Sequence, residues 1–255
     1  MSTSQLPIKY KAIVEYDGTC FYGFQRQQNL ITVQGVLENA LAKFNSCHPQ
    51  VFCAGRTDTG VHATGQVIHF SILRNLWGEK IKAALNYHLK SYAVAIVSAE
   101  NLGVNNNFHA RFDAVKRQYI YKVLVQNYPP VINKNRYLWT KVQPDLNLLN
   151  QASQLLVGKH DFSNFRSSQC QAKSPLKTVE SINIYHTDNV ILIEVTAPSF
   201  VHHQIRFMVG AMLEVGYKNQ PLSYISHLLT GPSSGEINKP PLAPAHGLYF
   251  HKVWY

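Results

Sequence analysis

The sequence is poor in cysteine and contains no cysteine pair of the kind that binds zinc. Its four cysteines form no CxxC motif and lie at Cys20, Cys47, Cys53 and Cys170. The spacing between the second and the third fits no common zinc-binding pattern. We therefore interpret the cysteines as small, buried apolar residues.

Histidine is common, with 12 copies, but no HExxH motif occurs. The one adjacent pair, His202 and His203, would point in different directions from a helix. The sequence thus predicts no metal site, and it shows no motif for a bound cofactor.

Long apolar runs are missing as well, because none approaches the roughly 18 residues that a membrane span needs. The opening stretch MSTSQLPIKY has neither a basic segment followed by an apolar one nor a small-residue cleavage site. We therefore expect a cytoplasmic protein that does not associate with a membrane.

Acidic residues are scarce: 14 Asp and Glu face 24 Lys and Arg, which gives a formal net charge of +10. Such a surface attracts polyanions through phosphate neutralisation and counterion release, so nucleic acid is the first partner to test. A basic surface can equally be a solvated face without a partner, and the net charge alone does not favour either interpretation. With 45% apolar residues in 255, the chain can bury a substantial core.

Strand and helix patterns alternate along the chain. Apolar alternation predicts a strand over residues 8–16, and helical spacing predicts a helix from Val33 to Phe44 behind Thr32 as N-cap. The same patterns predict strands over residues 67–70, 92–97, 117–125 and 248–255, a hairpin over 179–197, helices over 79–89, 145–158 and 200–216, and a short helix that ends at Gly231. An Asn-rich stretch near residues 100–108 divides the pattern, so we predict an α+β protein with an N-terminal half, 1–105, and a C-terminal half, 106–255.

The predicted helix over residues 200–216 carries a cation among apolar residues. At about 100° per residue, His202, His203, Arg206 and Gly210 would share one side, opposite an apolar stripe. A buried guanidinium needs an anionic partner, because leaving it unpaired costs several kcal/mol. Arg206 should therefore face a carboxylate or a phosphate. The alternative is an arginine whose head simply reaches solvent past apolar neighbours.

Asp58 is a candidate partner for Arg206. It lies in the stretch AGRTDTGVHATGQVIHF, between two threonines and two glycines and just ahead of an apolar strand. An aspartate in such a setting often binds its own backbone as a turn or helix cap. The DTG triplet also occurs in aspartic proteases, but these need two aspartates that share a proton, and no second DTG or DSG occurs here. Asp58 therefore acts as a single carboxylate.

Five blocks, taken in order, are similar to the signature blocks of the TruA-type tRNA pseudouridine synthases. They are GRTDTGVHATGQVIHF, FHARFDAVKRQYIY, HDFSNFR, SFVHHQIRFMVG and APAHGLYF. The likeness runs from about Tyr10 to the C-terminus. Two positions depart from the family pattern: Thr59, where alanine is more common, and Gln204, where methionine is common. Neither is a position to which we assign chemistry.

The resemblance implies a pseudouridine synthase fold, in which two related α/β halves surround a mixed, mainly antiparallel sheet with a central basic cleft. It also implies isomerisation of uridine to pseudouridine without a metal or another cofactor. The family's catalytic carboxylate corresponds to Asp58, its paired arginine to Arg206, and its base-stacking tyrosine to Tyr119. A base in an RNA stem must leave the stack before its glycosidic bond can be reached, which explains the need for an aromatic surface.

Further residues are implied as RNA contacts. Arg56 corresponds to the arginine that helps displace the target base. Phosphate contacts are expected from Arg26, from Arg166, and from Lys173 and Lys177 in a mobile basic loop over residues 166–177. The family's substrate is the 3′ side of the tRNA anticodon stem-loop, at uridines thirty-eight to forty, and its members are homodimers. Because the family acts on many tRNAs, the resemblance implies that the protein recognises the shape and the backbone of the RNA and not the edges of its bases.

Two other functions compete with this interpretation. A non-catalytic tRNA-binding protein or chaperone on the same scaffold would need the basic surface but not the set of Asp58, Arg206 and Tyr119. A hydrolase acting on a small glycoside would need two carboxylates, and the few acidic residues leave little choice near Asp58. We therefore expect the isomerase.

Overall fold

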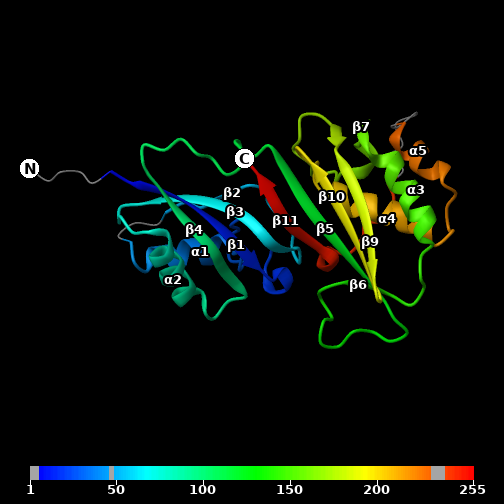
Figure 1. Ribbon diagram of the computed structural model, residues 1–255. Helices are drawn as coiled ribbons and strands as arrows, with labels where there is room; N and C mark the ends of the chain where they lie inside the picture. The colour runs from blue at the N-terminus through cyan, green and yellow to red at the C-terminus, as the bar shows by residue number, and fades with distance from the viewer. Residues whose placement is uncertain (1–5, 46–48, 231–238) are drawn as a thin grey trace, which may run out of the picture. The chain divides into compact units, whose positions relative to one another are not determined.

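The computed structural model describes residues 6–45, 49–230 and 239–255 (Figure 1). Cys47 and the predicted helix end at Gly231 lie outside these residues. The chain divides into two units: Met1–Val115 together with Tyr249–Tyr255, and Lys116–Leu248.

A mixed sheet forms the first unit. Strand β1 (Ile8–Tyr16) pairs antiparallel with both β3 (His62–Ile72) and β4 (Val94–Val104). Strand β3 also pairs antiparallel with β2 (Phe52–Cys53) and parallel with β11 (Leu248–Trp254). The alternation that predicted β1 is reproduced as alternating burial along that strand.

Two helices complete the first unit. Helix α1 (Val33–Ala42) begins where Thr32 Oγ1 accepts a hydrogen bond from the Gly35 N–H, as the N-cap prediction required. It packs beside α2 (Gly78–Leu89), and α2 packs against β4. Both helices direct apolar side chains into the core at the predicted spacing.

The division between the units differs from the predicted one at residues 105 and 106. The polar stretch that we interpreted as a linker begins inside β4, which extends to Val104. The residues after it are tied to the C-terminal strand: the Val115 N–H donates to the Trp254 carbonyl, and the Tyr255 hydroxyl donates to the Ala110 carbonyl. Residues 106–115 and 249–255 therefore belong with the first unit.

His69 on β3 should make the stability of the protein depend on pH. The ring is 5% exposed, and its Nδ1 accepts a hydrogen bond from the Ala110 N–H. Burial, helped by the charges of His109 and Lys9, lowers the pKa of His69 from 6.5 to about 4. As the pH falls from 6.5 to 4, the unfolded chain takes up a proton that the folded ring does not, so stability falls through this window.

We expect this loss of stability to reach up to about 3 kcal/mol. The variant His69→Asn keeps an oxygen that can accept from Ala110 but does not titrate, and it should lack that part of the pH dependence. Urea unfolding of both proteins at several pH values between 7.5 and 4 measures the difference. The same pH slope in both proteins would contradict this role for His69.

The second unit also contains paired strands. Strand β10 (Val190–Ala197) pairs antiparallel with both β5 (Lys116–Val125) and β9 (Ser181–Thr187). Strand β6 (Leu138–Thr140) pairs parallel with β5. The predicted hairpin of β9 and β10 is confirmed, and so is the prediction of a mixed, mainly antiparallel α+β architecture.

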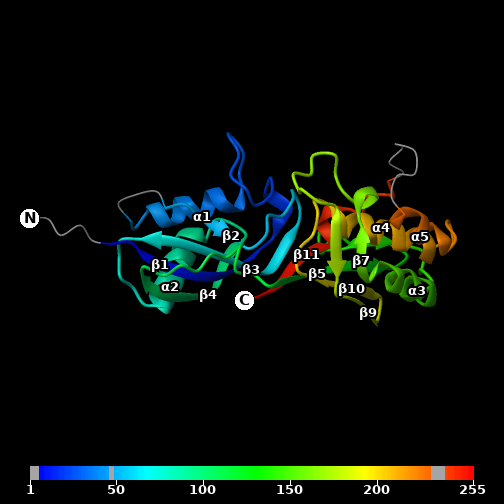
Figure 2. The same ribbon diagram turned by 90° about the horizontal axis from the view of Figure 1, so that it is seen from above.

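Helices α3, α4 and α5 pack against one another in the second unit, and both views show them together (Figures 1 and 2). Their bounds are Leu146–Leu156, Gln204–Gly216 and Ser223–Leu229. A separate two-stranded sheet joins β7 (Gly158–Asp161) and β8 (Leu176–Val179). Among the described residues, no helix is long and apolar enough to cross a membrane.

Three local predictions were wrong. The helix predicted from residue 200 begins at Gln204, because His203 has a left-handed backbone with φ of 68°. The predicted loop over residues 166–177 ends earlier, since Lys177 lies in β8. Among the cysteines that the structure describes, Cys20 is exposed, and Cys53 and Cys170 are only partly buried.

Candidate functional site

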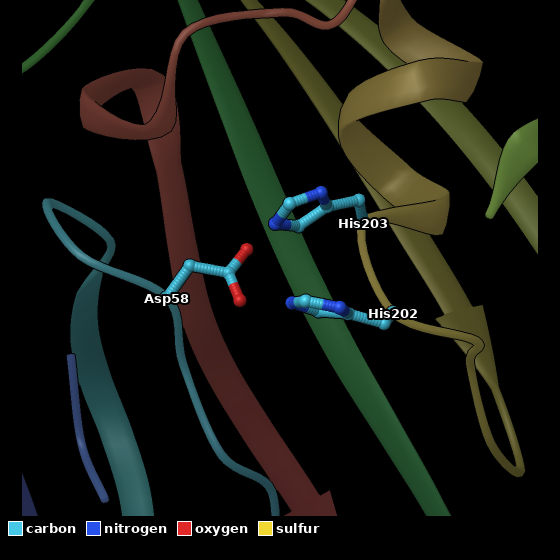
Figure 3. A group of neighbouring side chains, drawn as sticks. All are labelled: Asp58, His202 and His203. Atoms are coloured by element: carbon cyan, nitrogen blue, oxygen red, sulfur yellow. The ribbon is translucent and has the colours of Figure 1, made fainter. Parts of the chain in front are cut away.

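Asp58 lies in a loop, residues 54–61, that connects β2 to β3 in the first unit (Figure 3). Its side chain is partly exposed, whereas the preceding Thr57 is buried and Arg56 is exposed. The Asp58 carbonyl accepts a hydrogen bond from the Val61 N–H at 3.1 Å, which closes the turn. The loop thus buries its middle and presents Asp58 and Arg56 nearer to solvent.

Neighbouring backbone holds this loop closely. The Thr57 carbonyl accepts from the Phe24 N–H at 3.0 Å, and its hydroxyl is 2.7 Å from the hydroxyl of buried Tyr16. Gly23 has φ of +81°, and a Cβ there would lie 2.8 Å from the Thr57 carbonyl oxygen. A Cβ at Gly18 would lie 2.1 Å from the Val61 carbonyl oxygen. Only glycine permits this approach, so the Asp58 backbone has little freedom to move.

Burial keeps the Tyr16 hydroxyl protonated beside the loop. Desolvation raises the pKa of Tyr16 well above its ordinary value of 10, and the negative charge of Asp58 adds to the rise. Tyr16 is therefore a neutral hydrogen-bonding partner that fixes Thr57, next to Asp58 in the sequence. No proton transfer is expected from this phenol near neutral pH.

Arg26 lies ahead of α1 and is already engaged. Its Nε is 2.8 Å from Oε2 of the buried Glu38, which also accepts from the Val51 N–H. About half of the Arg26 side chain, 49%, remains exposed, so it can still meet an anion. Arg26 also lines a groove of about 480 Å³ with Thr32 and Asn39, and Asp58 is not among the lining residues.

Arg206 lies in the first turn of α4 in the second unit and is partly exposed rather than fully buried. Its Nε donates to the Ala243 carbonyl at 2.7 Å, and the Ala243 N–H donates back to the Arg206 carbonyl at 3.2 Å. A Cβ at Gly210, one turn along, would lie 1.8 Å from the Pro241 carbonyl oxygen. The segment over residues 241–243 is thus packed directly on α4 and orients the guanidinium.

Tyr121 supports the other side of this segment. Its hydroxyl donates to the Pro244 carbonyl at 2.8 Å, and its ring would be 2.6 Å from a Cβ at Gly247. Burial raises the pKa of Tyr121, while the nearby positive charge of Arg206 opposes that rise. Two side chains from β5 and α4 therefore hold the same stretch of backbone.

His202 and His203 precede α4 instead of sharing a helical face with Arg206 (Figure 3). Their ring centroids are 3.9 Å apart, so the prediction that they point in different directions was wrong. The His202 carbonyl accepts from the Ser167 N–H, and its N–H donates to Sγ of Cys170. No role for this pair could be predicted, because nothing in the residues SFVHHQ indicates the left-handed turn at His203.

The remaining predicted residues lie at separate places in the second unit. Tyr119 is partly exposed on β5, and Phe200 packs edge-on against its ring with centroids 5.3 Å apart. Arg166 is partly exposed at the end of a short 3-10 turn. Lys173 is exposed in the loop ahead of β8, and Lys177 is partly exposed on that strand. These cations are available at the surface of the second unit, whereas Arg26 and Arg56 belong to the first.

Comparison with known proteins identifies a family. The sequence profile of a family described as tRNA pseudouridine synthase matches residues 12–113 and 152–255. The chain is 42% identical over 251 residues to tRNA pseudouridine synthase A of Ehrlichia chaffeensis, covering 97% of this chain and 100% of that protein. It is 40% identical over 247 residues to tRNA pseudouridine synthase A of Rhodospirillum centenum, covering 97% and 99%. A crystal structure of a Cbf5-Nop10-Gar1 complex aligns with 80% of this chain and 45% of that one, at 10% identity and a TM-score of 0.35.

Proposed function

The chain belongs to the tRNA pseudouridine synthase family, and we propose that it isomerises uridine to pseudouridine in tRNA with the Asp58 carboxylate as catalytic group. The observation that carries this proposal is the family match over residues 12–113 and 152–255, which includes the positions of Asp58 and Arg206. Tyr119 falls between the two matched ranges, so its role depends on the signature block alone.

The reaction is a balanced rearrangement of one nucleotide. The bond between uracil N1 and ribose C1′ breaks, a bond from uracil C5 to C1′ forms, the proton on C5 leaves to solvent, and N1 takes up a proton from solvent. Asp58 can serve by attacking the sugar, by attacking the base, or by removing a ribose proton. Each of these routes requires the ionised carboxylate, and the close backbone support from Thr57 and Gly23 favours a fixed position for it.

Arg206 and Tyr119 complete the proposed machinery. A cation facing Asp58 would favour its ionised form against the cost of desolvation, and the resemblance assigns this task to Arg206. The hydrogen bond from Arg206 to Ala243 supports it by fixing the guanidinium on α4. Tyr119 would receive the displaced uracil on its ring, and Arg56 would help to displace it.

The proposed target is the 3′ side of the anticodon stem-loop, at uridines thirty-eight to forty. Reaction of an unmodified tRNA transcript with the protein, followed by carbodiimide treatment and primer extension, locates each pseudouridine. We expect stops on the 3′ side of the anticodon stem-loop. Stops confined to another arm of the tRNA would refute this choice of target while leaving the isomerase intact.

Lys173 and Lys177 are proposed phosphate contacts. A plot of log K for tRNA binding against log salt concentration has a negative slope, whose magnitude should fall by about 1 for each phosphate contact that is lost. The double variant Lys173→Ala, Lys177→Ala should therefore show a slope smaller in magnitude by about 2. Filter binding of tRNA over a range of salt concentrations measures the slope. An unchanged slope would show that these lysines do not contact phosphate.

We also propose a homodimer and a cytoplasmic location, both by analogy with the family. The net charge of +10 and a tRNA substrate are consistent with the location. Light scattering of the purified protein would test the dimer, and a mass equal to one chain at working concentration would refute it.

A further inference from the structure

An exposed phenylalanine lies at the tip of a hydrogen-bonded turn in the first unit, over residues 109–113. The His109 N–H donates to Oδ2 of Asp113 at 2.9 Å, and the Asp113 N–H donates to the His109 carbonyl at 3.1 Å. The His109 ring also accepts, at Nδ1, from the N–H groups of Arg111 and Phe112. Four hydrogen bonds within five residues fix the direction in which Phe112 projects.

Phe112 is the outer member of a group of rings. It is 74% exposed, and its ring centroid is 4.2 Å from that of His109. His109 in turn lies 4.6 Å from buried His69 and 5.5 Å from Phe52. The ring of Phe112 therefore rests on a supported aromatic base and leaves much of its surface to solvent. A ring supported in this way offers an aromatic face on which a nucleobase can stack.

Positive charge lies beside this ring. The Arg111 guanidinium carbon is 5.8 Å from the Phe112 ring centroid. Burial of the Cys53 thiol on β2 raises its pKa to about 12, and the charges of Arg56 and Arg111 oppose that rise. Both guanidinium groups thus lie near the strand that also carries Phe52. An aromatic face with an arginine beside it matches an unstacked nucleobase with its phosphate.

We propose that Phe112 and Arg111 form a subsite for one unpaired nucleotide, with the base stacked on Phe112 and its phosphate on Arg111. The subsite rests on the proposed function in so far as the ligand is RNA. It uses a ring other than that of Tyr119, and we assign it to a nucleotide other than the reacting one. Every base has a π-face that can stack on the ring. The subsite should therefore select nucleotides that are unpaired, whichever base they carry.

The test compares binding of two RNA probes to the full-length protein. The first is an oligouridylate of about eight nucleotides, and the second is a blunt duplex whose bases are all paired. Phe112→Leu keeps an apolar side chain but removes the ring, and it should weaken oligouridylate binding about tenfold. Duplex binding should change less than twofold, and Phe112→Tyr should restore the affinity for the oligouridylate. Arg111→Gln should lower the salt slope for the oligouridylate by about 1.

Trp77 provides the matched control, because it is an aromatic residue of the same unit with the same exposure of 74%. Trp77→Leu should bind the oligouridylate as the wild type does. Equal oligouridylate affinity in Phe112→Leu and the wild type would overturn the subsite. So would equal losses in Phe112→Leu and Trp77→Leu, or equal losses for both RNA probes.

The outcome for the subsite is independent of the outcome for the proposed function. Binding is measured without turnover, so loss of affinity in Phe112→Leu supports the subsite even if the wild type forms no pseudouridine. Conversely, a wild type that forms pseudouridine while Phe112→Leu binds normally would retain the function and remove the subsite.

Discussion

Asp58→Asn is expected to lower the rate of pseudouridine formation about 10⁴-fold or more, while the dissociation constant for tRNA changes less than about threefold. Asparagine has the shape of aspartate but cannot attack as a nucleophile or accept a proton at neutral pH. The backbone contacts around Thr57 and Gly23 do not involve this carboxylate, so the loop should keep its conformation. Nucleoside chromatography of digested tRNA measures the product.

Thr59→Ala is the control for this variant. Thr59 is exposed in the same loop, and the family more often carries alanine there, so activity should remain within about threefold of the wild type. Turnover by Asp58→Asn at a rate near that of Thr59→Ala would remove Asp58 from the chemistry. Equal loss of turnover in both variants would show that the loop as a whole had been disturbed.

Gly210→Ala should have the second largest effect, because it acts on the support of Arg206. The new Cβ would lie 1.8 Å from the Pro241 carbonyl oxygen, a backbone atom that cannot move without shifting residues 241–243. That shift would separate the Arg206 Nε from the Ala243 carbonyl, now 2.7 Å away. We expect a loss of about 3 kcal/mol in the free energy of unfolding and a fall in kcat larger than any rise in KM.

Gly35→Ala is the matched control in another helix. Its new Cβ would approach only a side-chain atom, Oγ1 of Thr32, at 3.1 Å. Alanine is favoured over glycine in a helix by about 1 kcal/mol, which should offset the cost of a small displacement of the Thr32 hydroxyl. Urea unfolding and steady-state kinetics of the two variants give the comparison. If Gly210→Ala were as stable and as active as Gly35→Ala, the proposed support of Arg206 by residues 241–243 would be wrong.

The elements that were predicted correctly are those with strong local patterns. The alternation of apolar residues located β1 and β5, and helical spacing with a capping threonine located α1. The fold prediction is confirmed by the family match together with these pairings, and the family match and the relatives confirm the prediction of a tRNA pseudouridine synthase. The signature blocks allowed both predictions, because five blocks similar to those of the family occur in the same order in this sequence.

The errors arose where structure depends on contacts distant in sequence. The start of α4 is set by a left-handed residue, His203. The unit boundary is set by two hydrogen bonds near the C-terminus, one from the Val115 N–H to the Trp254 carbonyl and one from the Tyr255 hydroxyl to the Ala110 carbonyl. The support of Arg206 comes from Ala243, 37 residues further along the chain. No spacing rule reports such contacts, so the sequence indicated the residue Arg206 but not what orients it.

The most direct test of the central claim is release of tritium from uracil C5 by the wild-type protein. An unmodified tRNA transcript labelled at that carbon is incubated with the protein, without added metal or nucleotide, and tritium in the water is counted. The isomerase must lose the C5 proton when the new bond to the ribose forms, so release should accompany each pseudouridine made. Tight tRNA binding without any release would contradict the claim and identify a non-catalytic tRNA-binding protein.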